Sequence, residues 1–356
     1  MNPNNFCIIM AGGTGSRFWP MSRPNHPKQF IDIFGQGKTM LQSTFERYSK
    51  LCPRENIIIV TSEAFEDKVR MQIPSLLDHQ VLCEPTRRNT APCVAYAAAI
   101  INEINPNANI IVSPSDHAIF GDSQFEHDLG EAISVTDKHD WIVTLGATPS
   151  NPNTKYGYIQ FAEDPSLSED CNLHKVVTFT EKPPLEMAMQ FIQSGEFLWN
   201  AGIFVWRLPV LMEAYRKFLP NVADNFFSLG IASPKEDIER AYTAVEKISV
   251  DFGIIEKAEN VHVMKSTFGW SDVETWDSLY QTCNKDDYGN AIAAGEVMLY
   301  DCNDCMIHVA DGRTLIVKDL DDYIVNVTEK KVLICPRNQE QMIAKFASDF
   351  YLKNEK

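Results

Sequence analysis

Short apolar runs recur along the first three quarters of the chain, with longer mixed segments between them. Four of these runs are nearly continuous in β-branched and other apolar residues: 6–10, 56–61, 108–113 and 141–146. Such runs are typical of strands that are buried on both faces of a parallel sheet. The Ala-rich segment 90–102 instead favours a helix. Because apolar strands alternate with helices, residues 1–280 are expected to form a doubly wound, mostly parallel α/β domain.

The pattern of apolar residues changes near residue 289. Five short β-like runs follow, at 294–299, 306–309, 315–317, 323–327 and 332–334. Turn residues such as Asp321-Asp322 separate them, and the last segment, 339–352, is helix-like. This arrangement predicts a small β module over residues 289–356 that is closed by a helix. A few coils of β-helix would fit the spacing, although the sequence has no strict six-residue repeat.

The chain of 356 residues carries a formal net charge of −16 at pH 7. This acidic surplus argues against a nucleic-acid surface, which requires basic patches. No apolar run approaches the length of a membrane span, and the N-terminus lacks the pattern of a signal peptide. We therefore expect a cytoplasmic protein with reduced cysteines. Cys302 and Cys305 have a metal-like spacing, but they lack the second pair that a zinc site requires.

A glycine-rich loop follows the first predicted strand directly. Its glycines let backbone N–H groups approach an anion, because no Cβ stands in the way. Three cations follow within one short segment: Arg17, Arg23 and Lys28. The combination predicts a cradle for a polyphosphate. No Lys-Ser or Lys-Thr follows at the spacing of a P-loop, and the third glycine of a dinucleotide fingerprint would fall at Phe18, which disfavours a nicotinamide-dependent dehydrogenase.

This loop resembles the signature of the sugar-nucleotide pyrophosphorylases, in particular the mannose-1-phosphate guanylyltransferases. Ser22-Arg23 and the segment 27–30 look like the bacterial form of that signature. Further segments resemble family motifs and follow in family order: 84–92, 114–117, 156–159, 179–183, 199–204, 249–257 and 269–276. The resemblance implies a fold of the nucleotide-diphospho-sugar transferase type. It also implies a C-terminal β module that is used in subunit contacts, hence a homodimer, and no fused isomerase domain.

The resemblance assigns roles to residues in each motif. It implies nucleotide binding by nine positions: Gly12, Gly13, Thr14, Gly15, Ser16, Arg87, Asn89, Thr90 and Ser115. It implies sugar-phosphate binding by Gly157, Glu181 and Asn200, and catalytic cations at Arg17, Lys28 and Lys182. Asp116 and Asp272 would be the ligands of Mg²⁺, a hard ion that prefers oxygen. Glu274-Thr275 departs from the Gly-Ser that is usual beside the second aspartate. From the residues alone, either Asn89 or Thr90 could cap the helix at 90–102.

The implied reaction joins GTP and α-D-mannose 1-phosphate into GDP-mannose and releases pyrophosphate. The sugar phosphate would attack the α-phosphorus in line, so that neutralising two polyanions is the main catalytic task. Two alternatives stay open at this point. One is a catalytically silent regulatory subunit that senses a sugar nucleotide, although the cations and aspartates of the motifs are intact. The other is a guanylyltransferase for another sugar 1-phosphate, such as fucose or glucose 1-phosphate.

Overall fold

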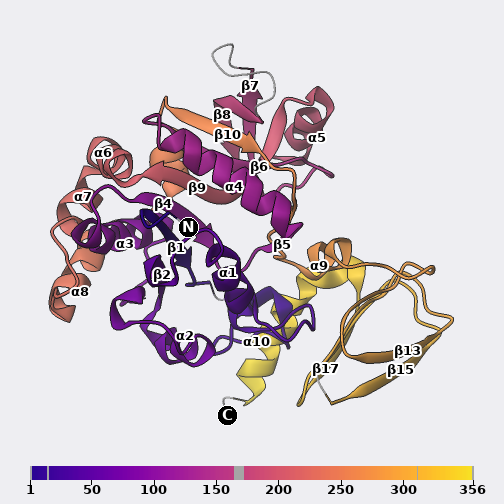
Figure 1. Cartoon of the computed structure of the whole chain (residues 1–356). Helices are drawn as coiled ribbons and strands as arrows, with labels where there is room; N and C mark the ends of the chain where they lie inside the picture. The colour runs from indigo at the N-terminus through magenta and orange to yellow at the C-terminus, as the bar shows by residue number, and fades with distance from the viewer. Residues whose placement is uncertain (1, 14–15, 164–171, 311, 355–356) are drawn as a thin grey trace. The chain divides into compact units, whose positions relative to one another are not determined.

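The computed structural model describes residues 2–13, 16–163, 172–310 and 312–354 (Figure 1). The chain forms two compact units, each assembled from segments that are far apart in the sequence. Unit 1 consists of Met1–Gly12, Phe45–Ser115 and Ile119–Trp270. Unit 2 consists of Gly13–Thr44, Asp116–Ala118 and Ser271–Lys356. The polypeptide therefore passes from unit 1 to unit 2 within the glycine-rich loop and again beside Asp116.

Unit 1 contains a mixed sheet with nine strands among the described residues, in the order β3-β2-β1-β4-β9-β6-β10-β8-β7. These strands are β1 (Asn5–Met10), β2 (Ile57–Ser62), β3 (Val81–Glu84), β4 (Asn109–Pro114), β6 (Ile142–Ala147), β7 (Gly157–Ala162), β8 (Leu173–Glu181), β9 (Phe197–Arg207) and β10 (Val261–Lys265). β1 is parallel to β2 and β4, whereas β9 is antiparallel to β4 and β6. The predicted α/β class is confirmed, and the sheet is mixed because antiparallel β9 lies between β4 and β6.

Both faces of this sheet are covered. Phe6 and Ile8 of β1 belong to one large apolar cluster, which also contains residues of α3 (Thr90–Ile104), α6 (Leu208–Phe218), α7 (Pro220–Phe226) and α8 (Lys235–Ala244) (Figure 1). Cys7 and Ile9 alternate with them and are fully buried as well. Because successive side chains of a strand point to opposite faces, burial of both sets requires cover on each side.

Unit 1 contains three further α-helices among the described residues. They are α2 (Glu66–Gln72), α4 (Asp122–Thr136) and α5 (Leu185–Ser194), with single turns at η3 (Arg54–Asn56), η4 (Glu63–Phe65), η5 (Asp78–Gln80) and η6 (Asp251–Ile255). Helix α1 (Met40–Tyr48) spans the boundary between the units. β5 (Ala118–Phe120) and β11 (Gly269–Ser271) form a separate two-stranded sheet. None of the helices in the described part of the chain has the length and apolar character that crossing a membrane requires.

Unit 2 carries the strand-rich C-terminal module. One sheet contains β12 (Ala291–Ala294), β14 (Met306–Val309), β16 (Tyr323–Val327) and β17 (Val332–Pro336), and a second pairs β13 (Glu296–Tyr300) with β15 (Thr314–Lys318). Glu296 stands opposite Thr314, and Met306 opposite Ile324, eighteen positions later in both cases. Parallel strands that stack at this offset are coils of a β-helix, and apolar residues fill their interior. Antiparallel β17 ends the stack.

Two expectations for this module need correction. The run 294–299 is not one strand, because the chain turns at Gly295, whose φ of +95° is a conformation that favours glycine. The turn separates β12 from β13. The closing segment 339–352 is not one helix either: a 3₁₀ turn, η7 (Arg337–Met342), precedes α10 (Ile343–Asn354). The other helical elements of unit 2 are η1 (Ser16–Phe18), η2 (Lys28–Phe30) and α9 (Trp276–Thr282).

Candidate active site

The stem of the glycine-rich loop is fixed at the carboxyl end of β1. The backbone N–H of Ala11 donates to the carbonyl of Val60 at 2.7 Å, and the Thr61 hydroxyl donates to the carbonyl of Ala11 at 3.0 Å. Ligands of open α/β sheets bind beyond such strand ends. Thr14 and Gly15 lie outside the described residues, as does the side chain of Ser16. Their contacts with a nucleotide therefore stay predictions.

The segment after β3 forms the N-terminus of α3. Asn89 is the capping residue, since its side chain accepts a hydrogen bond from the backbone N–H of Thr90 at 2.9 Å. Its φ of +70° is in the left-handed region, which asparagine tolerates better than most residues. The hydroxyl of Thr90 is used differently, because it accepts from the backbone N–H of Val250 at 2.9 Å. Of the two capping residues that the sequence allows, the structure has Asn89.

Lys28 is the centre of a polar cluster in unit 2. Its ammonium lies 3.0 Å from the carboxylate of Asp116 and donates to the backbone carbonyls of Asp272 and Val273 at 2.7 and 3.0 Å. Lys28 is only 4% exposed, and a buried ammonium requires acceptors of this kind. Two aspartates that are far apart in the sequence therefore lie around a single cation.

The oxygens of this cluster fit the chemistry of a divalent ion. Burial alone would raise the pKa of Asp116, but the Lys28 ammonium, His117 and a backbone hydrogen bond together outweigh burial and lower that pKa below its usual value. The carboxylate is thus ionised at neutral pH. The Asp272 side chain accepts from the backbone N–H of Glu274 at 3.1 Å. Among the described residues, no three His, Cys, Asp or Glu side chains are grouped to hold a metal by themselves. Phosphate and water oxygens would have to complete the shell, as is usual for Mg²⁺.

Arg17 forms an ion pair with Glu274, one of the two residues that depart from the sequence expected beside Asp272. The Arg17 and Glu274 side chains are 51% and 40% exposed. An exposed ion pair contributes little to stability, because water screens both charges. A polyphosphate that carries several charges can therefore compete with Glu274 for the guanidinium.

The predicted sugar-phosphate residues meet in unit 1. Gly157 of β7 stands opposite Glu181 of β8, and a Cβ on Gly157 would lie 2.6 Å from the Glu181 Oε2. Only glycine leaves room for this carboxylate. Lys182 follows with a φ of +50°, and its ammonium pairs with Glu181 at 2.5 Å. A carboxylate and an ammonium thus stand together where the resemblance implies a sugar hydroxyl and a phosphate.

Asn200 lies on β9 with its amide oriented by three neighbours. Its oxygen accepts from the Thr144 hydroxyl and from the backbone N–H of Gly202, both at 3.1 Å. Its nitrogen donates to the carboxylate of Asp251 at 2.7 Å, which leaves one N–H of the amide available. Burial, followed by the negative charge of Glu181, raises the pKa of Asp251 to about 6.

Asp251 is a residue that the sequence analysis did not assign to the site. It lies on η6, inside the family-like segment 249–257. The resemblance of that segment to a family motif was the signal in the sequence that could have indicated Asp251. The sequence alone does not distinguish its carboxylate from that of a surface residue. Its contact with Asn200 places it beside the residues that are predicted to bind the sugar phosphate.

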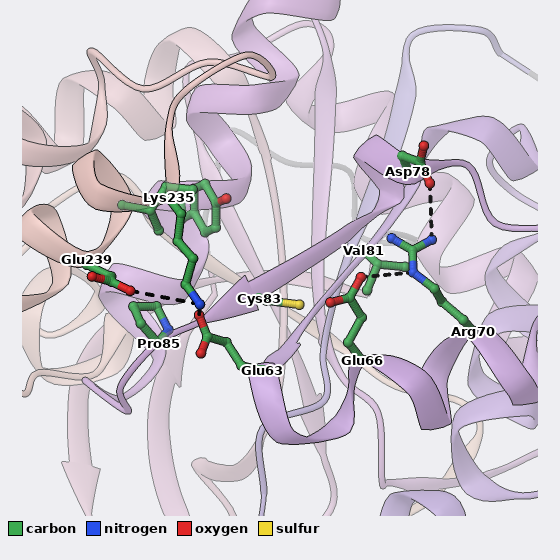
Figure 2. Close-up of a pocket in the computed structure, with 11 residues that line it drawn as sticks. Glu63, Glu66, Arg70, Asp78, Val81, Cys83, Pro85, Lys235 and Glu239 are labelled. Carbon is green, nitrogen blue, oxygen red and sulfur yellow. Dashed lines mark hydrogen bonds and ion pairs between the residues drawn. The ribbon is translucent and has the colours of Figure 1, made fainter.

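A pocket of about 390 Å³ lies beside β3, the edge strand of the sheet (Figure 2). Figure 2 shows its charged side chains in two groups: Lys235 with Glu63 and Glu239, and Arg70 with Glu66 and Asp78. Charged side chains are a common protection of an edge strand against pairing with other chains. The lining residues include none of the site residues that the sequence predicts.

Comparison with protein families gives a match between residues 6–288 and the model of the family described as "Nucleotidyl transferase". The chain belongs to the nucleotidyl transferase family. Two curated relatives in this family are the mannose-1-phosphate guanylyltransferases of Salmonella montevideo and Escherichia coli K12. The first is 34% identical, over 98% of this chain and 74% of its own length. The second is 33% identical, over 95% of this chain and 72% of its own length.

A solved structure is similar to this nucleotidyl transferase over nearly the whole length of both chains. It comes from Thermus thermophilus and is described as a "mannose-1-phosphate geranyltransferase". It aligns with a TM-score of 0.87 and 28% identity, and it covers 98% of this chain and 99% of its own. The agreement includes the C-terminal strand-rich module, which is therefore part of the fold of both proteins.

The nucleotidyl transferase brings some of the predicted residues together within each unit. Lys28, Asp116 and Asp272 form one cluster, and Arg17 pairs with Glu274, two positions after the second aspartate. The predicted sugar-phosphate residues Gly157, Glu181 and Asn200 lie with Lys182 and Asp251. Arg87 is exposed, and Ser115 is buried. Their roles toward a nucleotide stay predictions.

Proposed function

We propose that this nucleotidyl transferase makes GDP-mannose and pyrophosphate from GTP and α-D-mannose 1-phosphate. The observation that carries the proposal is the Lys28 cluster, in which one buried cation contacts the carboxylate of Asp116 and the backbone carbonyl of Asp272, the two aspartates of the expected metal site. The names of relatives that are 33–34% identical over nearly the whole chain support guanosine and mannose as the two parts of the product. The intact cluster also disfavours a silent regulatory subunit.

The reaction is a single displacement at phosphorus. A phosphate oxygen of mannose 1-phosphate attacks the α-phosphorus of GTP, one P–O bond forms, and the bond to the leaving pyrophosphate breaks. Two polyanions meet in this step, so positioning and charge neutralisation supply most of the rate enhancement. The attacking phosphate is already ionised, and no strong general base is needed.

Each cation has a distinct task in this scheme. Lys28 keeps Asp116 ionised and neutralises charge near the α-phosphate. Arg17 leaves Glu274 to hold the β- and γ-phosphates and then the pyrophosphate that departs. Lys182 binds the phosphate of the sugar, with Glu181 and Asn200 accepting and donating hydrogen bonds to sugar hydroxyls. Asp116 and Asp272 would hold Mg²⁺, which when bound neutralises phosphate charge.

The product assignment is tested with a matrix of nucleoside triphosphates against sugar 1-phosphates, analysed by mass spectrometry of the nucleotide sugars. GDP-mannose as the dominant product supports both halves of the assignment. Another GDP-sugar as the dominant product would support the same reaction with a sugar 1-phosphate other than mannose 1-phosphate as the substrate. Absence of any product, with GTP still bound, would favour the regulatory subunit. A cytoplasmic homodimer is a further part of the proposal, and sedimentation of the purified protein tests the dimer.

A further inference from the structure

Two cations of unit 2 lie near one another although they are far apart in the sequence. Arg23 belongs to the segment after the glycine-rich loop, and Lys331 lies directly before β17, in the turn that follows β16. Burial, then the Arg23 guanidinium and then the Lys330 ammonium lower the pKa of Lys331 below its usual value. Like charges act on a lysine in this way only at short range, so the two side chains face a common space.

The positive charges of this pair are not offset by acidic side chains. Carboxylates raise the pKa of three other lysines, namely Lys50, Lys235 and Lys318. In the part of the chain that the structure describes, no carboxylate contributes to the pKa of Lys331, and Arg23 takes part in no ion pair. Neighbouring cations without a counterion repel one another, and a bound anion would remove that repulsion.

The same region contains buried donors without acceptors. Among the described residues, the Nε of Arg23, the Nε1 of Trp19 and the hydroxyl of Tyr351 are buried and make no hydrogen bond. The rings of Trp19 and Tyr351 each lie 5.7 Å from the ring of Phe350, and the Lys331 ammonium lies 4.8 Å from the centre of that ring. Buried donors without acceptors are destabilising, and the oxygens of an anion are acceptors.

Both cations are carried by tight turns. Arg23 and His26 exchange two backbone hydrogen bonds, of 3.0 and 2.8 Å. In the other turn, the N–H and the hydroxyl of Thr328 donate to the carbonyl of Lys331 at 2.8 and 3.0 Å, and the hydroxyl accepts from the N–H of Lys331 at 3.0 Å. Because these bonds already fix both backbones, a ligand would have to order only the ends of two side chains.

We propose that Arg23 and Lys331 bind a phosphate group, either inorganic phosphate or the phosphate of a small monoester. A guanidinium presents paired N–H donors to two phosphate oxygens, and an ammonium supplies a compact charge beside them. With Lys330 next to this pair, the positive charge suits a dianion better than a singly charged carboxylate. The contacts of Lys28 are with other residues, so this site is additional to the one that is proposed to hold the substrates.

The test measures the rate at which reductive methylation modifies Lys331 in the intact protein, by mass spectrometry of its peptide. A lysine with a lowered pKa reacts readily, whereas a bound anion raises that pKa and covers the amine. If the dissociation constant is about 1 mM, inorganic phosphate at about 10 mM should slow the modification of Lys331 roughly tenfold. Lys318, which pairs with Asp301 on the surface, should keep its rate in the same sample. Sodium chloride of equal ionic strength controls for screening.

Two matched variants assign the effect to the site. Arg23→Ala should abolish the protection of Lys331, whereas Arg17→Ala, which removes another cation near the glycine-rich loop, should retain it. A rate for Lys331 that phosphate leaves unchanged in the wild type, or protection that persists in Arg23→Ala, would overturn the proposal. Loss of protection in Arg17→Ala would overturn it too, because the effect would then belong to the polyphosphate site. If Arg23→Ala does not fold, the comparison of Lys331 with Lys318 in the wild type decides.

A second titration distinguishes the two sources of the phosphate. Protection of Lys331 by glycerol 3-phosphate at lower concentrations than by inorganic phosphate supports the site and identifies a phosphate monoester as its ligand. Equal or weaker protection by glycerol 3-phosphate supports a site for inorganic phosphate. Neither titration contains GTP or mannose 1-phosphate, so the outcome does not depend on the proposed function.

Discussion

The Lys28 ammonium and the Asp116 carboxylate lie 3.0 Å apart in an environment where Lys28 is almost wholly buried. The same ammonium donates to the backbone carbonyl of Asp272. One side chain therefore links the carboxylate of Asp116 to the backbone of Asp272, which comes from a distant part of the sequence. It also keeps Asp116 ionised, which is the form that a divalent ion requires.

Replacing Lys28 should destabilise the fold as well as remove activity. Lys28→Met leaves the Asp116 carboxylate and two carbonyls without their donor, and breaking a buried pair lowers the free energy of unfolding by about 3 kcal/mol. Urea unfolding at pH 7 measures this loss. Lys318→Met is the matched control, since Lys318 pairs with Asp301 on the surface. The midpoint of urea unfolding of this variant should hardly differ from that of the wild type. Equal midpoints for Lys28→Met and the wild type would contradict the account.

The effect of Lys28 should also depend on pH. The lowered pKa of Asp116 means that its pairing stabilises the fold above the usual pKa of an aspartate and that this contribution is lost as the pH falls through the native pKa. The difference in unfolding free energy between wild type and Lys28→Met should therefore shrink in acid. A difference that is constant from pH 7 to pH 3 would show that the pairing of Asp116 is not its source.

Arg17→Ala should lower the rate of pyrophosphate release by roughly 100-fold or more, as expected when a group that stabilises phosphate charge is removed. The melting temperature should stay the same, because the pair with Glu274 is largely exposed. A coupled assay for pyrophosphate measures the rate. Arg240→Ala removes another exposed arginine, on α8, and serves as the control. Normal pyrophosphate release by Arg17→Ala would contradict the assigned role.

Asp251 should make the stability of the protein fall as the pH rises through the weakly acid range. Its native pKa of about 6 exceeds the 3.8 of an ordinary aspartate, because burial and then Glu181 disfavour the charge. The native state gains from the bound proton below pH 4 and loses that advantage as the pH passes 6. Asp251→Asn should therefore become more stable relative to the wild type between pH 4 and pH 7.

Thermal unfolding at three pH values across this range tests the prediction for Asp251. The groups that face it are Asn200, Glu181 and Lys182, and the last two are charged side chains. Asp224→Asn, an exposed position on α7, should show the same pH dependence as the wild type. The same slope for Asp251→Asn and Asp224→Asn would refute the assignment of a raised pKa to Asp251.

Gly157→Ala should weaken binding of the sugar phosphate while leaving GTP binding unchanged. The new Cβ would lie 2.6 Å from the Glu181 Oε2 and 3.0 Å from the ring of Phe179, so the carboxylate must move. We expect an increase in KM for mannose 1-phosphate of roughly tenfold, the effect of about one lost hydrogen bond. Gly130→Ala, on α4 with open space around it, is the control. A KM for mannose 1-phosphate that matches this control would contradict the placement of Glu181.

Four strands of unit 1 that have parallel partners, β1, β2, β4 and β6, could be predicted from sequence because their apolar runs are nearly continuous. The run 108–113 became β4 at Asn109–Pro114, and 141–146 became β6 at Ile142–Ala147. β7 and β8 were not predicted. β8 alternates partly buried with exposed residues along much of its length, and its partners are antiparallel strands that only the fold supplies.

The site could be predicted residue by residue but not as an arrangement. The motifs indicated Lys28, Asp116 and Asp272 separately, and only the fold places both aspartates around one ammonium. Asp251 was not assigned a role because a single carboxylate in a sequence is more often a surface residue than a buried one. Its neighbour Asn200 comes from another part of the chain.

The most direct test of the central claim follows GTP, mannose 1-phosphate and Mg²⁺ with the purified protein by ³¹P nuclear magnetic resonance. The account predicts that signals of GDP-mannose and pyrophosphate appear in equal amounts while both substrates disappear, and that Asp116→Asn stops this exchange. Release of inorganic phosphate with formation of GDP, or no change in any signal, would contradict the claim that the Lys28 cluster serves nucleotidyl transfer to mannose 1-phosphate.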